Sequence, residues 1–249
     1  MLRLMVVTAH PDDEAGAFGG TVRLYADRGV ETCVLCMTPG QAASHRGNAR
    51  TDQELAEIRR KEFAASCAIL GVAKPIVLDF MDGRLHRLDL YHVVWEVTRQ
   101  VRTFRPHILV TFGSEGALTA HPDHSMVSVF ATLAFQWAGR NNRYPDQFHN
   151  GLGPHRTQKL YYGTAEFSLP DRQPVALAPI STVVEFAKQH LETKVAAFHA
   201  HQTQAPLFPI FENTVRRQGS REAFHLIAQA TPGVAHTEND LFEGVQEEA

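Results

Sequence analysis

Residues 2–14 read LRLMVVTAHPDDE, and this stretch sets the architecture of the chain. The segment Leu2 to Thr8 is apolar except for Arg3, as expected for a parallel strand that is covered on both faces. It leads into a turn, residues 9–14, that carries one histidine and three acids ahead of a helical pattern ending at Gly29. Ligands of open α/β sheets bind at the carboxyl ends of strands, so this turn is a candidate site.

Most of the remaining chain repeats this alternation of strand and helix patterns. We expect further strands at Thr32–Thr38, Pro75–Phe80, Ile108–Phe112 and Leu160–Thr164, an extended segment at Pro174–Ala178, and helices at Thr51–Leu70, Leu88–Phe104, Ser125–Trp137 and Ile180–His199. Such a series predicts an α/β fold, a Rossmann-like three-layer sandwich with a mostly parallel sheet and helices on both faces. We expect one domain over residues 1–249, with the acidic tail at about 237–249 only loosely attached.

The composition is that of an ordinary globular protein, with 44% hydrophobic and 20% charged residues. The formal net charge of −3 gives no reason to expect nucleic acid as a partner. We expect no membrane span, and residues 1–5 lack the pattern of a signal peptide, which predicts a cytoplasmic location. Cys33 and Cys36 match C-x-x-C, but their spacing puts the two thiols on opposite faces of a strand, so we expect buried structural thiols.

A second histidine-acid run, His121-Pro122-Asp123-His124, follows the fourth expected strand. Zn²⁺ in hydrolytic sites takes three protein ligands from His and acidic residues and keeps a position for water. His10, Asp13 and His124 meet this requirement, so we expect one Zn²⁺, or another divalent metal, per chain. Neighbouring side chains on a tight turn diverge, which leaves Asp12 as the candidate general base for the attacking water.

His121 precedes His124 by three residues and therefore faces the same side of a helix's first turn. We expect His121 to stabilise the oxyanion of the reaction or to protonate the leaving amine. Asp123 is expected to hold the tautomer of His121 and to favour its charged form. Together these groups predict metal-assisted transfer of an acyl group to water. An amide is the natural target, because its poor leaving group needs both a strong nucleophile and an acid.

Each motif also has a purely structural interpretation. Acids at positions 12–14 are favourable at a helix N-terminus, and the run at 121–124 can cap a surface helix. The occurrence of both runs at strand ends favours the metal site. The three glycines between residues 16 and 20 do not form G-x-G-x-x-G, and acids occupy the place of a pyrophosphate loop, which disfavours nucleotide binding.

At these residues the chain resembles the LmbE-like, or PIG-L-like, N-acetylglucosaminyl deacetylase family. The resemblance covers about the first 205 residues and rests on Ala9–Glu14, Arg59-x-x-Glu62, Leu70-Gly71-Val72, Asp82-Gly83-x-Leu85, Arg105-Pro106, His121–His124 and Lys194…His201-x-Thr203-Gln204. It implies the same fold, metal ligands, general base and oxyanion-stabilising histidine as the residue pattern. Members typically remove an acetyl group from an N-acetylated amino sugar joined to another group, and they commonly assemble as trimers or hexamers.

The chain departs from the family pattern after the second strand. Members often carry Thr-x-Gly-Glu there, whereas this chain has Thr38-Pro39-Gly40-Gln41. Gln41 and Arg59 are carried over only as candidate substrate-contacting residues. We expect substrate choice to reside in loops such as 41–50 and 139–154. His201 and Gln204 are left open between a place at the site and subunit packing.

The sequence therefore predicts a zinc-dependent hydrolase that removes an acetyl group from an N-acetylglucosamine-type conjugate, a small-molecule substrate. One alternative keeps the zinc and moves the scissile amide to a thiol conjugate or another N-acyl group. A non-catalytic sugar-binding module is a second alternative, against which the intact base and ligands argue. A nicotinamide-dependent oxidoreductase is a third, and it would require cofactor binding that we expect to be absent.

Overall fold

The structure is a computed structural model that describes residues 1–169, 175–234 and 236–247. One seven-stranded sheet has the order β3-β2-β1-β4-β5-β7-β6. The strands are β1 Arg3–Thr8, β2 Glu31–Cys36, β3 Lys74–Val77, β4 Ile108–Phe112, β5 Lys159–Thr164, β6 Thr182–Glu185 and β7 Arg221–Gln229. The first five run parallel, while β7 is antiparallel to both β5 and β6. The predicted mostly parallel sheet is confirmed.

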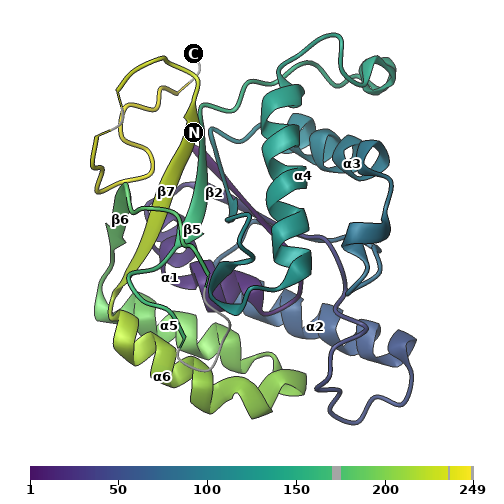
Figure 1. Cartoon of the computed structure of the whole chain (residues 1–249), viewed down its shortest axis with the longest axis vertical. Coiled ribbons are helices and arrows are strands. Elements are labelled where there is room, and N and C mark those ends of the chain that lie inside the picture. The colour runs from purple at the N-terminus through teal and green to yellow at the C-terminus, as the bar shows by residue number, and fades with distance from the viewer. Residues whose placement is uncertain (170–174, 235, 248–249) are drawn as a thin grey trace.

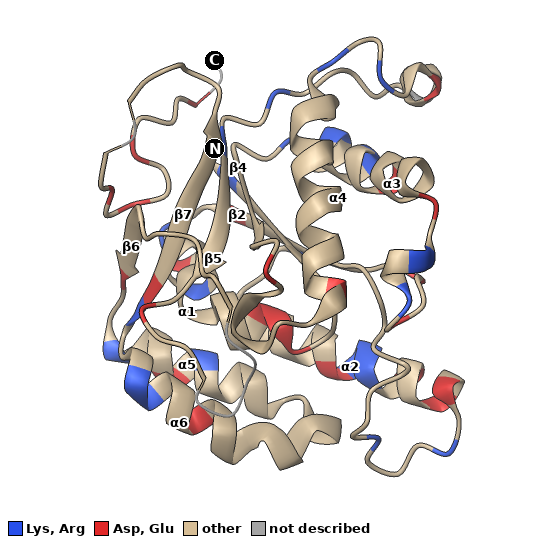
Figure 2. Ribbon diagram, in the orientation of Figure 1, with Lys and Arg blue, Asp and Glu red and all other residues tan. Residues whose placement is uncertain are grey.

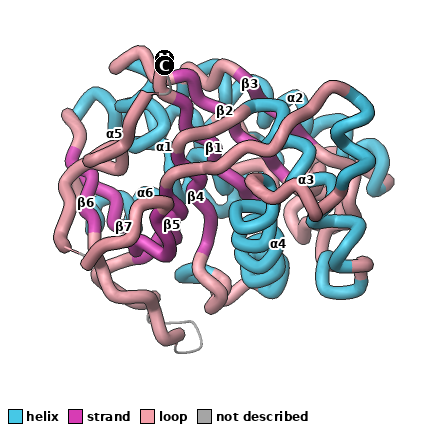
Figure 3. The backbone as a smooth tube through the Cα atoms, turned by 90° about the horizontal axis from the view of Figure 1, so that it is seen from above, coloured by secondary structure: helices cyan, strands magenta, loops and turns pink. Residues whose placement is uncertain are grey.

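Helices cover both faces of this sheet (Figures 1 and 3). They are α1 Asp13–Asp27, α2 Asp52–Leu70, α3 Leu90–Phe104, α4 Pro122–Ala138, α5 Lys188–His199 and α6 Phe208–Gln218, with short 3-10 helices η1 Leu85–Arg87, η2 Ala117–Thr119, η3 Pro145–Asn150 and η4 Gln202–Leu207. The first, second and fifth helices share one face, and α3 and α4 share the other. Within the described ranges, none of the helices combines the length and apolar character needed to cross a bilayer.

Two apolar cores result because alternate residues of a strand point to opposite faces. Leu4 of β1 packs in the core under α1, whereas the next residue, Met5, packs in the core under α3 and α4. Cys36 and Cys33 divide between the same two cores, and both thiols are buried and free. The spacing of the two cysteines therefore predicted their placement correctly.

The candidate site lies where the strand order changes direction. Leu4 of β1 pairs with Ile108 of β4, although the chain runs from β1 to β2 on the other side. The loops that leave β1 and β4 therefore emerge side by side at the carboxyl ends of the strands, where open α/β sheets bind ligands. This topology brings residues 9–14 against residues 113–121.

The expected helix at Ile180–His199 is wrong in its first part. Thr182–Glu185 forms the edge strand β6, which pairs with β7, and α5 begins only at Lys188. The β-branched residues of this strand favour an extended backbone that packs on a sheet. The following stretch, in which no element was predicted, contains α6 and β7. Of the expected extended segment Pro174–Ala178, the first residue lies outside the described residues.

The acidic tail packs on the core through Leu241, Phe242 and Val245. Leu241 is fully buried, and its N–H donates to the Tyr25 hydroxyl at 2.8 Å. The carboxylate of Glu238, 2% exposed, accepts from Lys159 Nζ at 2.6 Å. The loose attachment expected from acidity does not hold here, because buried groups on α1 and β5 pair with the tail's polar atoms.

The loop at residues 139–154 lies at the end of α4 opposite to the candidate site (Figure 1). Seventeen helical residues separate the two by about 25 Å. The buried guanidinium of Arg102 holds this loop by donating to the carbonyl oxygens of Ala138 at 3.1 Å, Arg143 at 2.8 Å and Tyr144 at 3.1 Å. The loop thus lies far from the candidate site of its own chain, and its expected part in substrate choice stays a prediction.

Candidate active site

The carboxylate of Asp13 stabilises the turn after β1. Asp13 Oδ2 accepts the backbone N–H groups of Ala9 at 3.1 Å and His10 at 2.8 Å. Asp13 is also the first residue of α1, where the helix dipole favours an acid. Asp12, just before the helix, has φ 115°, a backbone conformation that costs a non-glycine residue about 1–3 kcal/mol. The surrounding contacts must hold this turn.

Arg59 of α2 supplies most of these contacts. Its guanidinium donates to Asp12 Oδ2 at 2.8 Å, to the carbonyl oxygen of Gly40 at 3.2 Å, and to the carbonyl oxygen of Pro11. Gly40 has φ 69°, and a Cβ atom there would overlap the guanidinium. Arg59 is only 2% exposed, so it acts as a positioning residue for Asp12. This placement does not fit the substrate contact that the resemblance implied.

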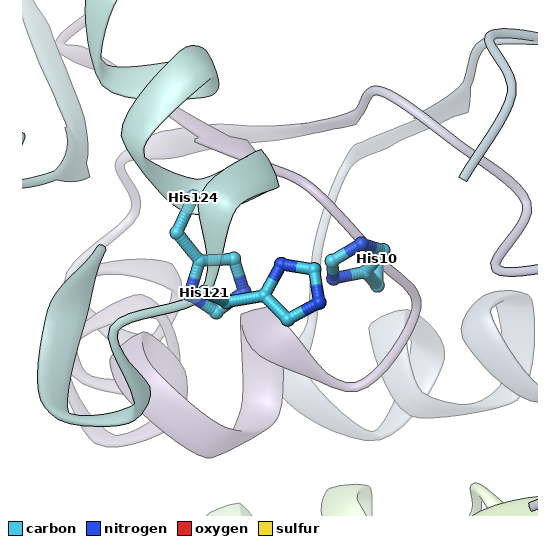
Figure 4. Close-up of side chains that lie close together, drawn as sticks. All are labelled: His10, His121 and His124. Atoms are coloured by element: carbon cyan, nitrogen blue, oxygen red, sulfur yellow. The ribbon is translucent and has the colours of Figure 1, made fainter. Parts of the chain in front are cut away.

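The second loop brings two histidines from the start of α4. His121 is the N-cap residue, and its Nδ1 accepts the backbone N–H of Asp123 at 3.2 Å. His124 Nε2 lies 3.1 Å from Asp13 Oδ1. The ring of His10 lies 4.7 Å from that of His121 and 5.4 Å from that of His124, centroid to centroid, so that three imidazoles converge (Figure 4).

The carboxylate of Asp123 lies beside His10, whereas the sequence predicted that it would hold His121. It accepts the backbone N–H groups of Gly83 at 2.7 Å and Leu85 at 3.3 Å, and its Oδ2 lies 3.4 Å from His10 Nε2. These two backbone donors draw the carboxylate toward His10. The contact with His121 is made by the Asp123 backbone instead, so the prediction that the carboxylate holds the His121 tautomer is wrong.

Asp82 is a site residue to which the sequence assigned no role, although it belongs to the Asp82-Gly83-x-Leu85 motif of the resemblance. Its Oδ1 lies 3.0 Å from His10 Nε2, and its Oδ2 accepts the N–H of Ala42 at 3.0 Å. The available signal was its position after the third strand, at the same edge of the sheet as the histidine-acid runs. Gln41, a candidate substrate contact, bonds to this same segment through the Phe80 carbonyl oxygen at 3.3 Å.

The donor atoms of this cluster fit a divalent cation. Two sets of side chains bring potential ligand atoms within 4.8 Å of one another, namely His10, His121 and His124, and His10, Asp82 and Asp123. Asp13 stands between two of the imidazoles, 3.6 Å from His10 Nδ1 and 3.1 Å from His124 Nε2. Acidic residues gather around the starts of α1 and α4 (Figure 2). Imidazole and carboxylate donors with excess negative charge suit zinc, iron or manganese.

A buried acid beneath the turn connects His201 to the site. Glu14 is fully buried, and its Oε1 lies 2.7 Å from His201 Nε2 and 2.5 Å from Ser66 Oγ. Its Oε2 accepts the backbone N–H of Asp12 at 2.9 Å. His201 therefore supports the turn through Glu14. The role of Gln204 is different, because its Nε2 donates to the His45 carbonyl oxygen at 3.1 Å and ties η4 to the loop 41–50.

Comparison with known proteins agrees with this geometry. The family model of PIG-L, described as GlcNAc-PI de-N-acetylase, matches residues 5–135, more than half of the chain. The chain belongs to the PIG-L family. The recognition based on the two histidine-acid runs is thereby confirmed.

Individual relatives of this PIG-L family protein cover most of its length. It is 30% identical to a 1D-myo-inositol 2-acetamido-2-deoxy-alpha-D-glucopyranoside deacetylase of Catenulispora acidiphila, over 97% of each chain. It is 31% identical to the mycothiol S-conjugate amidase of Streptomyces coelicolor, over 65% of this chain and 60% of that protein. The N,N'-diacetylchitobiose deacetylase structure from Pyrococcus horikoshii shares the fold, with a TM-score of 0.75 and 22% identity over 90% of this chain and 83% of that one.

Burial makes Asp12 of this PIG-L protein a weaker acid than an ordinary aspartate. Loss of solvent raises the pKa of Asp12 to about 6, and the neighbouring Asp13 charge adds to the increase, against the opposing effect of Arg59. A general base is most effective when its pKa lies near the working pH. Burial, His10 and His124 together lower the pKa of the half-buried His121, which favours its neutral form.

The carboxylates around His10 favour the protonated, positively charged form of its imidazole. Burial acts to lower the pKa of His10, but the carboxylates of Asp123 and Asp82 outweigh it and raise the pKa to about 10. For Asp13, burial is likewise outweighed, and His124 holds the carboxyl pKa below its usual range. The proton on His10 therefore supplies the positive charge that a bound cation would otherwise supply.

Proposed function

We propose that this protein is a metal-dependent hydrolase that removes the acetyl group from an N-acetylglucosamine-type conjugate, releasing acetate and an amine. The observation that supports this most directly is the position of Asp12. Its carboxylate is fixed by Arg59 beside the cluster of His10, Asp13 and His124. The deacetylases among its relatives point to the same reaction.

We propose His10, Asp13 and His124 as the residues that hold the ion, with Zn²⁺ as the first candidate. Such an ion, when bound, lowers the pKa of water from about 16 toward about 7 and polarises the carbonyl group. Imidazole and carboxylate groups are its usual ligands in hydrolytic enzymes. Asp82 and Asp123, both beside His10 Nε2, orient that imidazole and raise its basicity, as partners of a metal-binding histidine commonly do.

The side chains divide the proton transfers between them. Asp12 accepts a proton from the attacking water, and Arg59 keeps the carboxylate oriented for that step. His121 uses its Nδ1 lone pair to accept the Asp123 backbone N–H, so its proton is assigned to Nε2. That Nε2–H donates to the amide oxygen as negative charge develops on it. The proton held by Asp12 then passes to the leaving nitrogen, which separates as a neutral amine.

Acetate release tests this proposal. The zinc-loaded protein is incubated with N-acetylglucosamine linked to inositol, to malate or to a second N-acetylglucosamine, and with N-acetylated amino acids as controls. Release of acetate from the sugar conjugates, abolished by a chelator and restored by Zn²⁺, is the expected result. Failure to cleave any acetamido sugar at saturating metal would contradict it.

A zinc amidase acting on a thiol conjugate is the second candidate, favoured by the likeness to the mycothiol S-conjugate amidase. The same machinery would serve, with a larger acyl group in place of acetyl. Comparing cysteine-conjugate amides with acetamido sugars in the same assay separates the two.

We also propose that the protein self-associates as a trimer or hexamer. Light scattering of the purified protein measures this oligomeric state.

A further inference from the structure

Asp12 is held by contacts on its backbone as well as on its carboxylate. Arg59 donates to Asp12 Oδ2 at 2.8 Å. The carbonyl oxygen of Asp12 accepts the N–H of Gly16 at 2.7 Å, and the N–H of Asp12 donates to Glu14 Oε2 at 2.9 Å. The backbone contacts fix a residue whose φ is 115°, a conformation that a non-glycine residue keeps only when its surroundings enforce it. The acceptor of this N–H therefore helps to set where the Asp12 carboxylate points.

Glu14, which supplies that acceptor, differs from an ordinary acid at a helix N-terminus. The helix dipole favours an acid in the first turn of α1 even when the acid is solvated, but the Glu14 side chain is fully buried. Its Oε1 accepts from Ser66 Oγ at 2.5 Å and lies 2.7 Å from His201 Nε2. Burial of a carboxylate is costly unless hydrogen bonds satisfy it. These two contacts therefore keep Glu14 where its other oxygen reaches the Asp12 N–H.

The imidazole of His201 approaches Glu14 from a well-anchored backbone. The ring is fully buried, and among the described residues its Nδ1 has no hydrogen-bond partner. The contact of Nε2 with Glu14 is thus the one that explains a histidine at this position. Two residues further on, the N–H and the hydroxyl of Thr203 donate to Glu62 of α2 at 2.8 and 2.6 Å. This pair of hydrogen bonds fixes the start of η4, and with it the His201 ring.

One face of α2 supplies the other partners. Arg59, Glu62 and Ser66 follow one another at intervals of three and four residues, which places them on the same side of the helix. All three are buried, and their partners lie in the turn after β1 and in η4. Buried charged groups commonly stabilise a fold no better than apolar groups of similar volume. This polar face is therefore better explained by the turn that it holds than by packing.

We propose that Glu14 and His201 are positioning residues of the hydrolysis, because they fix the backbone of Asp12 in the orientation that directs its carboxylate to the attacking water. The inference rests on the proposed function, in which Asp12 is the general base. It gives a part in the reaction to a histidine 187 residues away from Glu14 in the sequence. Loss of the His201 contact should let the Asp12 carboxylate turn, while the proposed metal-binding side chains keep their own contacts.

Substitutions of His201 test this inference through kcat, KM and bound metal. With the zinc-loaded protein and an acetamido sugar, His201→Leu should lower kcat by about ten- to a hundred-fold and leave KM and metal content unchanged. His201→Gln, whose amide N–H can reach the same Glu14 oxygen, should restore most of the rate, whereas the shorter His201→Asn should not. His190→Leu is the matched control, because it removes a contact of 3.2 Å with Asp27 that joins α5 to the other end of α1. Its kcat should stay at the wild-type value.

A double-mutant cycle shows whether the effect passes through Asp12. In the Asp12→Asn background the base is already absent, so His201→Leu should lower kcat no further. A second loss of about ten-fold in that background would mean that His201 acts elsewhere, and it would overturn the inference. An equal loss of kcat in His190→Leu would overturn it as well, because the cause would then be a general change in packing.

Exchange of the Asp12 amide hydrogen, followed by NMR, tests the contact without any turnover. His201→Leu should speed this exchange about ten-fold or more, and the smaller change Ser66→Ala should act in the same direction if His201→Leu does not fold. Faster exchange in these variants, with no amide cleaved by the wild-type protein, supports the positioning contacts and contradicts the proposed hydrolase. Unchanged exchange, or an unchanged kcat of His201→Leu, overturns the inference and leaves the deacetylase standing.

Discussion

At the scale of single residues, the proposed chemistry depends most on Asp12. Asp12→Asn keeps the size of the side chain and removes its ability to accept a proton. We expect kcat to fall by about 10²- to 10⁴-fold, the usual contribution of a general base, while bound metal stays at the wild-type level. Steady-state kinetics and metal analysis measure both. Asp79→Asn is the control, because that carboxylate is 94% exposed, and full activity of Asp12→Asn would refute the assignment.

His10 makes metal binding dependent on pH. Because its pKa is raised to about 10 in the metal-free protein, a cation must displace a proton at any lower pH. We expect about one proton released per ion and an affinity that falls about ten-fold for each unit of pH below 10. The same bound proton stabilises the metal-free fold fully below the unfolded value of 6.5, and this stabilisation is lost as pH rises toward 10. Calorimetry in buffers of different ionisation enthalpy counts the protons, and a count of zero would contradict the prediction.

The sequence located the central residues of the cluster because they lie in two short runs. His10, Asp13 and His124 do converge, as the placement of both runs at strand ends predicted. Asp82 was missed because an Asp-Gly pair is typical of an ordinary turn, and its approach to His10 depends on tertiary packing. The orientation of the Asp123 carboxylate was missed for the same reason, since its backbone donors lie 38 and 40 residues away.

At the scale of elements, the turn after β2 holds Arg59 against the turn after β1. Gly40→Ala would drive a methyl group into the guanidinium, so we expect Asp12 to lose its orientation and kcat to fall at least ten-fold. Gly29→Ala is a matched control, because Gly29 also has a positive φ, 78°, but a Cβ atom added there would meet no other group within 4 Å. Both variants should lose about 1 kcal/mol or more of stability. Equal activity in the two would show that Arg59 does not position the base.

Element prediction succeeded where the apolar pattern was regular and failed where pairing partners were distant. The five parallel strands follow short apolar runs in sequence order, each with local signals. β6 was taken for the start of a helix because Thr182–Glu185 is too short to show alternation. Its strand conformation depends on pairing with β7, which begins 36 residues further along. Long-range pairing of this kind is invisible to a local pattern.

At the scale of the whole molecule, the tail contributes to global stability. Glu238 is buried with Lys159, so Glu238→Gln leaves an ammonium group without its charged partner in the interior. We expect a loss of about 3–5 kcal/mol in the free energy of unfolding, measured by urea titration. Glu247→Gln removes an exposed partner of the N-terminal amine and should cost less than about 1 kcal/mol. If the two variants were equally stable, the tail would contribute little to the fold, as its acidic composition alone suggests. A large difference would show instead that the tail stabilises the fold through its hydrogen bonds to Tyr25 of α1 and to Lys159 of β5.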